Sequence, residues 1–167
     1  MQRLILMRHA EAERAAGSGR DHDRVLSARG RLDAAAMGRA LAARGLRPDL
    51  ALVSPAARTR QTWELLHDAF GDVEVRADEP LYNGGSDILR RLVESAEDAA
   101  GCLMVVAHNP GIHLLAVEYL VESAASPSVL ERMSGGFPPG AAAIFTVDVA
   151  GRCAFEGFLQ PRDVAGG

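Results

Sequence analysis

The feature that most constrains the fold is an uninterrupted apolar run, Cys102-Leu-Met-Val-Val-Ala107. Six residues without a polar side chain are typical of a strand covered on both faces. Shorter apolar runs over residues 3–7 and 50–53 show the same pattern. A sheet built from such strands needs helices over both of its faces. We therefore expect an α/β fold.

Helical patterns separate these strands. Apolar residues recur at helical spacing from Leu32 to Leu41, after a candidate N-cap at Ser27 and before Gly45. Ser54-Pro55 suits an N-cap followed by an N1 proline, and predicts a helix to about Phe70. The other expected elements are a loop over 11–26, a weak strand over Val73–Arg76, a helix over Ser86–Ala99, a helix from Asn109-Pro110 to about Val121, a long loop over 123–140, and strands over Ala143–Val149 and Cys153–Leu159.

Strands alternating with helices in this order predict a three-layer α/β/α sandwich with a largely parallel central sheet. The last two strands follow one another directly, so they can add an antiparallel member. A length of 167 residues suits one domain over residues 1–167.

Composition excludes several classes of partner. The net charge of −4 provides no overall positive field that would attract nucleic acid or an anionic membrane. All eighteen basic residues are arginine. Cys102 and Cys153 lie in apolar runs without a CxxC spacing, which indicates reduced core residues in a cytoplasmic protein. The apolar run Leu4–Met7 ends at Arg8 and is too short for a signal or a membrane span.

Four side chains with affinity for anions follow predicted strands. Arg8 and His9 follow the first strand, Arg58 lies one turn into the helix after the second, and His108 follows the run that ends at Ala107. Ligands of open α/β sheets bind at the carboxyl ends of the strands, where helix N-termini also favour anions. We therefore expect these four residues to form one anion site.

Four motifs in this order resemble a known family. They are Leu-Met-Arg-His-Ala-Glu-Ala at 6–12, Asp-His-Asp-Arg-Val-Leu-Ser at 21–27 followed by Gly30, Ser-Pro-Ala-Ala-Arg-Thr-Arg-Gln-Thr at 54–62, and Val-Ala-His-Asn-Pro-Gly at 106–111. The set is similar to the signature of the histidine phosphatase superfamily, and more narrowly to its SixA branch of phosphohistidine phosphatases. The resemblance covers residues 3–66 and 102–112.

This resemblance implies a phosphoglycerate mutase-like fold and hydrolysis of phosphohistidine on a protein, without a cofactor or metal. His9 would be the nucleophile that becomes phosphohistidine, and Arg8, Arg58 and His108 would surround the phosphoryl group. Arg24, in the loop after the first strand, is a further candidate for substrate binding. A solvated loop charge is the alternative for Arg24.

The chemistry of these residue types agrees with such roles. A neutral imidazole is a good nucleophile towards phosphorus, and neighbouring arginine charges disfavour its protonation. Guanidinium groups bind phosphate oxygens in pairs and match the charge that develops during transfer.

The general acid is missing from its expected place. Mutase-like members of the superfamily carry a glutamate in a Leu-x-Glu setting, whereas this chain has Leu81-Tyr82-Asn83. Absence of this acid is known in the SixA branch. Carboxylates that could replace it are those of Asp78, Glu79 and Asp87 nearby in the chain, and those of Glu11 and Glu13 in the loop after the first strand. Each is also explained as a solvated surface charge.

Three other functions stay open at this point. The same site could hydrolyse small phosphate esters, or the chain could be a non-catalytic module that binds phosphate or phosphoproteins. A metal-dependent hydrolase is the third, although the spacing of His108 and His113 is no recognised ligand pattern. The partner is accordingly a phosphorylated protein, for instance a phosphorelay component, or a small phosphorylated molecule.

Overall fold

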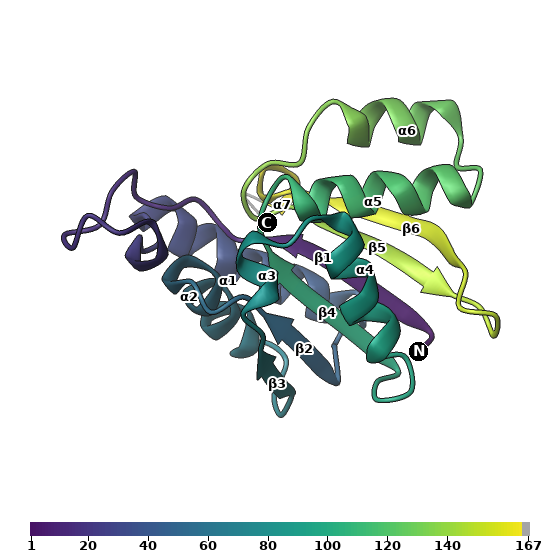
Figure 1. Ribbon diagram of the computed structural model, residues 1–167, viewed down its shortest axis with the longest axis horizontal. Coiled ribbons are helices and arrows are strands. Elements are labelled where there is room, and N and C mark those ends of the chain that lie inside the picture. The colour runs from purple at the N-terminus through teal and green to yellow at the C-terminus, as the bar shows by residue number, and fades with distance from the viewer. Residues whose placement is uncertain (165–167) are drawn as a thin grey trace.

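Six strands form a single sheet of order β3-β2-β4-β1-β5-β6 in the computed structural model, which describes residues 1–164 (Figure 1). The strands are β1 (Arg3–Arg8), β2 (Leu50–Val53), β3 (Glu74–Ala77), β4 (Cys102–Ala107), β5 (Ala142–Val147) and β6 (Cys153–Leu159). The helices are α1 (Ala28–Ala43), α2 (Ala57–His67), α3 (Pro80–Asn83), α4 (Ser86–Ser95), α5 (Gly111–Glu122), α6 (Pro127–Ser134) and α7 (Pro161–Val164), with a 3₁₀ turn, η1, at Asp21–Asp23.

The sheet is largely parallel, as the sequence predicts. β1 pairs with β4 in parallel, and β2 lies parallel to both β4 and β3. β5 is antiparallel to β1 and to β6, so β5 alone among the six strands runs against the others.

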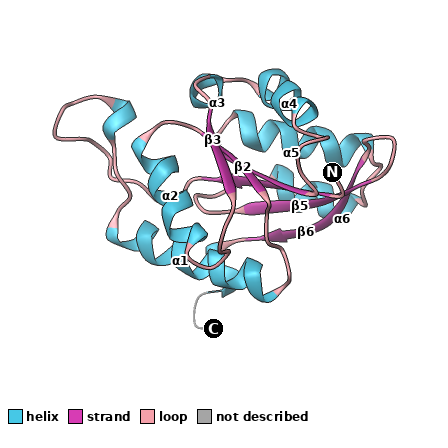
Figure 2. Ribbon diagram, turned by 90° about the horizontal axis from the view of Figure 1, so that it is seen from below, coloured by secondary structure: helices cyan, strands magenta, loops and turns pink. Residues whose placement is uncertain are grey.

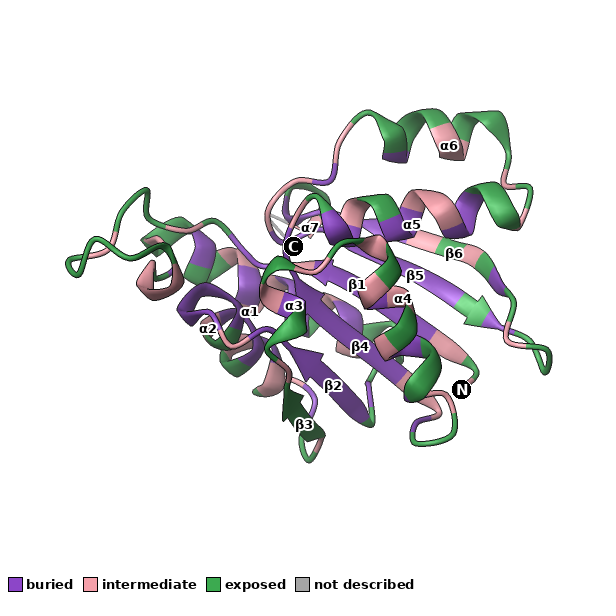
Figure 3. Cartoon of the chain, viewed as in Figure 1, coloured by how far each residue is buried: buried purple, intermediate pink, exposed green. Residues whose placement is uncertain are grey.

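Helices cover both faces of this sheet. Leu4 and Leu6 of β1 belong to a core packed under α4 and α5, whereas Ile5 and Met7 belong to a second core under α1 and α2. Figure 2 shows the strands in profile, with α4 and α5 on one side and α1 on the other. The predicted three-layer sandwich is confirmed. Figure 3 shows that β4 is buried from Leu103 to Ala107, as its apolar run predicts, while the edge strand β3 is exposed.

Strand register places three loop residues at one edge of the sheet. Arg8 pairs with Ala107 and Val53 pairs with Val106, so β1, β2 and β4 end at nearly the same level. The residues that follow them are therefore neighbours, although up to a hundred positions separate them in sequence. These are His9, Ser54 and His108.

Helix α1 begins and ends where the sequence predicts. The Ser27 hydroxyl accepts a hydrogen bond from the Gly30 amide at 3.0 Å, and Gly45 follows the helix with a φ of 72°. Gly30 packs against the segment after β1 so closely that a Cβ would overlap the Glu11 carbonyl. Close approach of backbones therefore explains the glycine.

Three expectations about local structure are wrong. The segment 123–140 contains the helix α6, because Pro127 suits the first turn and Met133 is buried against the neighbouring helix α5 and the sheet. The helix expected over Ser86–Ala99 ends at Ser95. Ser54 does not cap α2, because the helix begins at Ala57 with Ala56 as its N-cap, two residues after Ser54; the Ser54 hydroxyl contacts His108.

Within residues 1–164, no helix combines the length and the apolar character that crossing a membrane requires.

Candidate active site

His9 follows β1 and is buried, with 7% of its surface exposed. Its Nδ1 lies 2.7 Å from the carbonyl oxygen of Ala10. A carbonyl only accepts, so Nδ1 carries the hydrogen and the neutral ring keeps its lone pair on Nε2. Burial is the main cause that lowers the pKa of His9 to about 4. The hydrogen bond to Ala10 raises this pKa, whereas the positive charges of Arg8, Arg58 and Arg24 lower it further. At neutral pH this imidazole is therefore an uncharged nucleophile.

Arg8 is the last residue of β1, and the loop before β5 holds its guanidinium. Its Nη1 donates to the Phe137 carbonyl at 3.1 Å. The Asn109 side-chain amide donates to the same carbonyl at 3.0 Å. Burial, and then the charge of Arg58, lower the pKa of Arg8 from its usual value. Two guanidiniums are thus held close enough to repel one another, an arrangement that a bound anion would relieve.

Arg58 comes from the first turns of α2 and is 5% exposed. Its Nη1 donates to the Asp21 carbonyl at 2.9 Å, and its Nη2 donates to the Asp21 carboxylate at 3.1 Å. The loop after β1 therefore fixes this guanidinium through the η1 turn. Its other N–H groups stay available for a ligand.

Asp21 joins three parts of the site. Its carboxylate accepts hydrogen bonds from the Tyr82 hydroxyl at 2.5 Å and from Arg24 Nε at 2.9 Å, besides the bond from Arg58. The Tyr82 hydrogen bond, the largest cause, and the two arginines hold the pKa of this carboxyl well below its usual range. Asp21 was not among the site residues predicted from the sequence, although it is the first residue of the motif at 21–27.

Tyr82, at the end of α3, is the second residue that sequence reasoning missed. Its ring packs edge-on against the His108 ring at 5.5 Å between centroids, and the Arg58 guanidinium lies 5.9 Å from the ring centre. Nothing in the sequence distinguishes Tyr82 from a surface aromatic residue, because its contacts come from three distant segments.

His108 follows β4 and is 8% exposed. Its Nε2 lies 2.7 Å from the Ser54 hydroxyl, and its ring centroid is 5.3 Å from that of His9. Burial first, then His9 and Arg58, lower the pKa of His108 to about 3. His108 is therefore neutral in the free protein.

Buried polar atoms without a hydrogen-bond partner mark where a ligand fits. Among the described residues, four such side-chain atoms occur, and all four belong to this site. They are Arg8 Nε, Arg58 Nε, His108 Nδ1 and Asn109 Oδ1. Buried donors are normally paired, so three groups that can donate hydrogen bonds point to an anionic ligand.

Arg24 reaches this site through Asp21 and not by direct contact with the other arginines. Its Nε donates to the Asp21 carboxylate and its Nη1 donates to the Glu13 carbonyl at 2.9 Å. A role in substrate binding stays a prediction.

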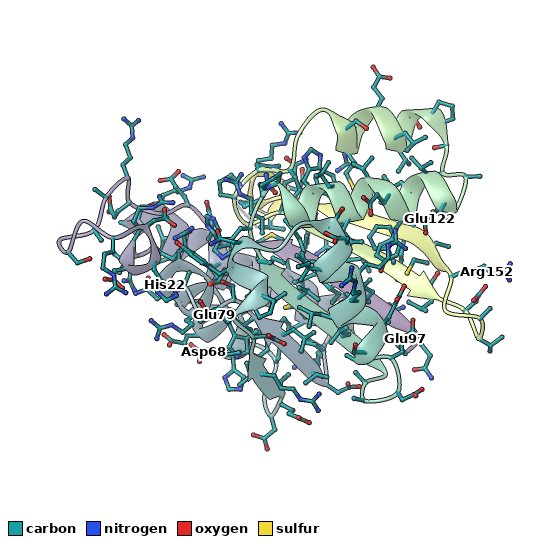
Figure 4. All side chains as sticks on the ribbon, in the orientation of Figure 1. His22, Asp68, Glu79, Glu97, Glu122 and Arg152 are labelled. Atoms are coloured by element: carbon teal, nitrogen blue, oxygen red, sulfur yellow. The ribbon has the colours of Figure 1, made fainter. Side chains whose placement is uncertain are left out.

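None of the candidate carboxylates contacts the clustered residues. Glu11 accepts a hydrogen bond from the Ser27 hydroxyl at 2.8 Å, and Asp87 lies 3.7 Å from Arg91. Glu79, labelled in Figure 4, is exposed, and so is Asn83. Within residues 1–164, none of these four side chains hydrogen-bonds to Arg8, His9, Arg58 or His108.

His113 lies in α5 and contacts α6, whereas His108 follows β4 at the site. Its Nε2 donates to the Met133 carbonyl at 2.7 Å, which ties α5 to α6. The described residues contain no cluster of three or more His, Cys, Asp or Glu side chains suited to a metal.

Comparison with known proteins places this arrangement in a family. Residues 4–85 match the sequence pattern of the histidine phosphatase superfamily (branch 1). A candidate phosphohistidine phosphatase SixA from Agrobacterium tumefaciens has 30% sequence identity and a TM-score of 0.84, over 96% of this chain and 98% of that one. Another from Nakamurella multipartitia has 31% identity and a TM-score of 0.82, over 96% of each chain.

A further relative matches over a similar length. An uncharacterized protein of Mycobacterium tuberculosis is 35% identical over 162 residues, which are 93% of this chain and all of that protein. Sequence and structure thus agree over nearly the whole chain, and the protein belongs to the histidine phosphatase superfamily, where it is of the SixA type.

Proposed function

We propose that this protein hydrolyses phosphohistidine on a protein substrate, and that His9 carries the phosphoryl group between two steps. Membership of the superfamily supports a phosphatase. The observation that carries the finer proposal is His9 itself, a buried neutral imidazole with its lone pair on Nε2 beside two guanidiniums.

In the first step, Nε2 of His9 attacks phosphorus and the bond from phosphorus to the substrate nitrogen breaks. A substrate imidazole protonated on its other nitrogen then leaves as a neutral ring. Arg8 and Arg58 would stabilise the charge on the equatorial oxygens. His108 would donate from Nδ1 in the tautomer whose Nε2 accepts the Ser54 hydroxyl hydrogen.

In the second step, water attacks phosphorus of the phosphohistidine and the bond to Nε2 breaks. The electron pair returns to Nε2, a proton of the water passes to solvent, and inorganic phosphate leaves. The Ala10 carbonyl keeps the hydrogen on Nδ1 throughout, so His9 is restored in its starting tautomer.

The missing acid favours phosphohistidine over simple phosphate esters. An alkoxide needs a proton in the transition state, a service worth roughly a hundred- to ten-thousandfold in rate. Phosphohistidine protonated on its other ring nitrogen needs no proton from the protein, because its imidazole leaves as a neutral ring. Glu11, Glu79 and Asp87 make no hydrogen bond to Arg8, His9, Arg58 or His108 within the described residues. The Asp21 carboxylate is bonded to Arg58, but its lowered pKa keeps it ionised, so it holds no proton to donate.

A side-by-side assay tests the proposal. Wild type and His9→Ala are given a histidine-phosphorylated protein and a small aryl phosphate, with and without a chelator. We expect wild type to prefer the phosphoprotein, and His9→Ala to be inactive on both. Preference for the small ester supports the esterase alternative. Binding without turnover supports the binding module, and loss on chelation supports a metal-dependent hydrolase.

A further inference from the structure

A cavity of about 750 Å³ lies directly beside Arg8. Its volume falls within the range of small-ligand sites, roughly 300 to 1,000 Å³. Arg8 and Asn109 line it, whereas His9, Arg58 and His108 do not. The cavity therefore adjoins the proposed phosphoryl site and shares Arg8 and Asn109 with it.

The rim of this cavity is the loop 135–140, and the site itself holds the loop in place. Arg8 and Asn109 both donate to the Phe137 carbonyl, and the Gly140 amide donates to the His9 carbonyl at 2.8 Å. Pro138 and Pro139 restrict the backbone between these contacts. The rim is thus built by the same hydrogen bonds that position Arg8.

Arginines outnumber carboxylates in the lining, in a chain whose net charge is −4. The carboxylates are engaged elsewhere: Glu11 accepts from Ser27, and Asp33 accepts from Arg29 at 3.1 Å. Two further arginines line the cavity, Arg132 of α6 and Arg162 of α7.

These two guanidiniums are weakly paired. Arg162 is exposed and makes no ion pair within residues 1–164. Arg132 donates to the Phe158 carbonyl at 2.9 Å and lies 3.9 Å from the Asp163 carboxylate. The cavity therefore presents positive charge that the protein neutralises only in part.

A buried polar side chain also faces this space. Gln160 lines the cavity and is 6% exposed, yet its side-chain amide makes no hydrogen bond within the described part of the chain. Its amide atoms are not among the fully buried unpaired atoms of residues 1–164, so the amide group is accessible from the cavity. A ligand carboxylate could accept from the amide nitrogen, so Gln160 is a second observation, independent of charge, that points to a ligand.

We propose that this cavity binds a negatively charged part of the substrate's leaving group, with Arg132 and Arg162 as its charge partners and Gln160 as a hydrogen-bond donor. The inference rests on the proposed function, because the phosphoryl group would lie on the other side of Arg8. The preferred substrates then carry a carboxylate near the phosphoryl group, as an acidic peptide or as a small molecule.

Paired substrates test this proposal. Phenyl phosphate is compared with 4-carboxyphenyl phosphate, and a phosphohistidine peptide flanked by glutamates with one flanked by glutamines. Kinetics are measured for wild type, Arg162→Ala, and Arg132→Ala combined with Arg162→Ala. Arg152→Ala is the control, because this exposed arginine lies at the far end of the molecule from His22, which packs against Tyr82 at the site (Figure 4).

We expect KM for the carboxylate-bearing substrates to rise about two- to fivefold in the single variant and about tenfold in the double variant, with kcat nearly unchanged. Neutral substrates and the Arg152→Ala control should change less than twofold. The effect should shrink at high salt. Melting temperatures check that the Arg132 contact to β6 is not needed for folding, and Arg132→Lys keeps the charge if it is.

An unchanged KM for carboxylate-bearing substrates in a folded double variant, with normal turnover of phenyl phosphate, would overturn the proposal and leave the proposed function intact. A larger rise in KM for the glutamate-flanked peptide than for 4-carboxyphenyl phosphate assigns the anion to a protein substrate. An equal rise in KM for the two assigns it to a small molecule. If nothing is turned over, calorimetry with benzylphosphonate and 4-carboxybenzylphosphonate decides the same question, since only the carboxylate form should lose affinity in the double variant.

Discussion

His9 and His108 are uncharged because the fold buries them, and this burial makes the site suitable for nucleophilic attack. Desolvation is the largest cause of the lowered pKa of each ring, ahead of the neighbouring charges. A charged phosphoryl group entering the site would reverse part of this effect for His108, because an anion favours its protonated form.

Asp21 should act as a positioning residue. Asp21→Asn keeps the shape but removes the charge that holds Arg58 and Arg24. Because half of the Asp21 side chain is exposed, we expect a moderate loss, about five- to twentyfold in kcat/KM, with little change in melting temperature. Asp23→Asn is the matched control, since Asp23 pairs only with Ser18, Arg20 and His22. Equal, small effects of both changes would contradict the role.

Site residues could be predicted from the sequence where a single motif contains them and shows their role. Arg8, His9 and His108 could be grouped because they lie at the ends of strands, and Arg58 because its helix follows a strand. The ends of these strands share one edge of the sheet. Asp21, Tyr82 and Ser54 could not be grouped with them, because their contacts join segments that the sequence keeps far apart. Ser54 was expected to cap α2, but the helix begins at Ala57 and the Ser54 hydroxyl contacts His108.

Helix α3 determines which side chain meets the site at the position of the missing acid. Tyr82 contacts His108 and Asp21, whereas Asn83 is exposed. Rates across a series of aryl phosphates should therefore fall steeply as the leaving-group pKa rises, because no acid assists.

Asn83→Glu tests whether a carboxylate at position 83 can reach the leaving group of these aryl phosphates. We expect the slope to stay steep, since an exposed side chain at 83 does not deliver a proton to the site. A flattened slope would show that residue 83 does reach the leaving group. Fast turnover of alkyl phosphates by wild type would instead implicate another acid, with Glu79 and Asp87 the first to replace.

The start of α1 should be sensitive to a single methyl group. Gly30→Ala places a Cβ against the Glu11 carbonyl, so the backbone must shift, and we expect a loss of about 2–4 kcal/mol in the free energy of unfolding. Gly17→Ala is the control, because no atom lies within 4 Å of the added Cβ, and it should change stability by less than about 0.5 kcal/mol. Urea denaturation measures both, and equal stabilities would contradict the close approach.

Among the elements, the long buried strands and the capped helix α1 were the most predictable. Their signals are local, namely an apolar run or a cap with helical spacing. α6 was missed because the serines, glycines and prolines around it suggest a loop, and its buried residue Met133 gains its place only by packing on the rest of the fold. α3 and α7, with four residues each, are too short to show a period.

For the whole molecule, neutral buried histidines predict instability in mild acid. The pKa values of His9 and His108, about 4 and about 3, lie below the ordinary 6.5. As the pH falls from 6.5 towards 4, the unfolded chain binds protons that the native state does not, so stability falls. At pH 5 this costs roughly 2 kcal/mol for each histidine, or somewhat less for the interacting pair.

Urea denaturation at pH 7.5 and pH 5 checks this expectation. Replacing both histidines with asparagine should remove most of the difference between the two pH values. Asp21 does not interfere, because its lowered pKa loses stability only below the ordinary range of a carboxyl group. A wild-type stability that is unchanged at pH 5 would contradict the neutral buried pair.

The most direct test of the whole account is to trap the intermediate. Wild type is mixed with labelled substrate, quenched with base within the first turnover, and digested for mass spectrometry. We predict one phosphoryl group on the imidazole of His9, stable in base and lost in acid, and no turnover by His9→Ala. A label on any other residue, or His9→Ala turning over at the wild-type rate, would contradict the account.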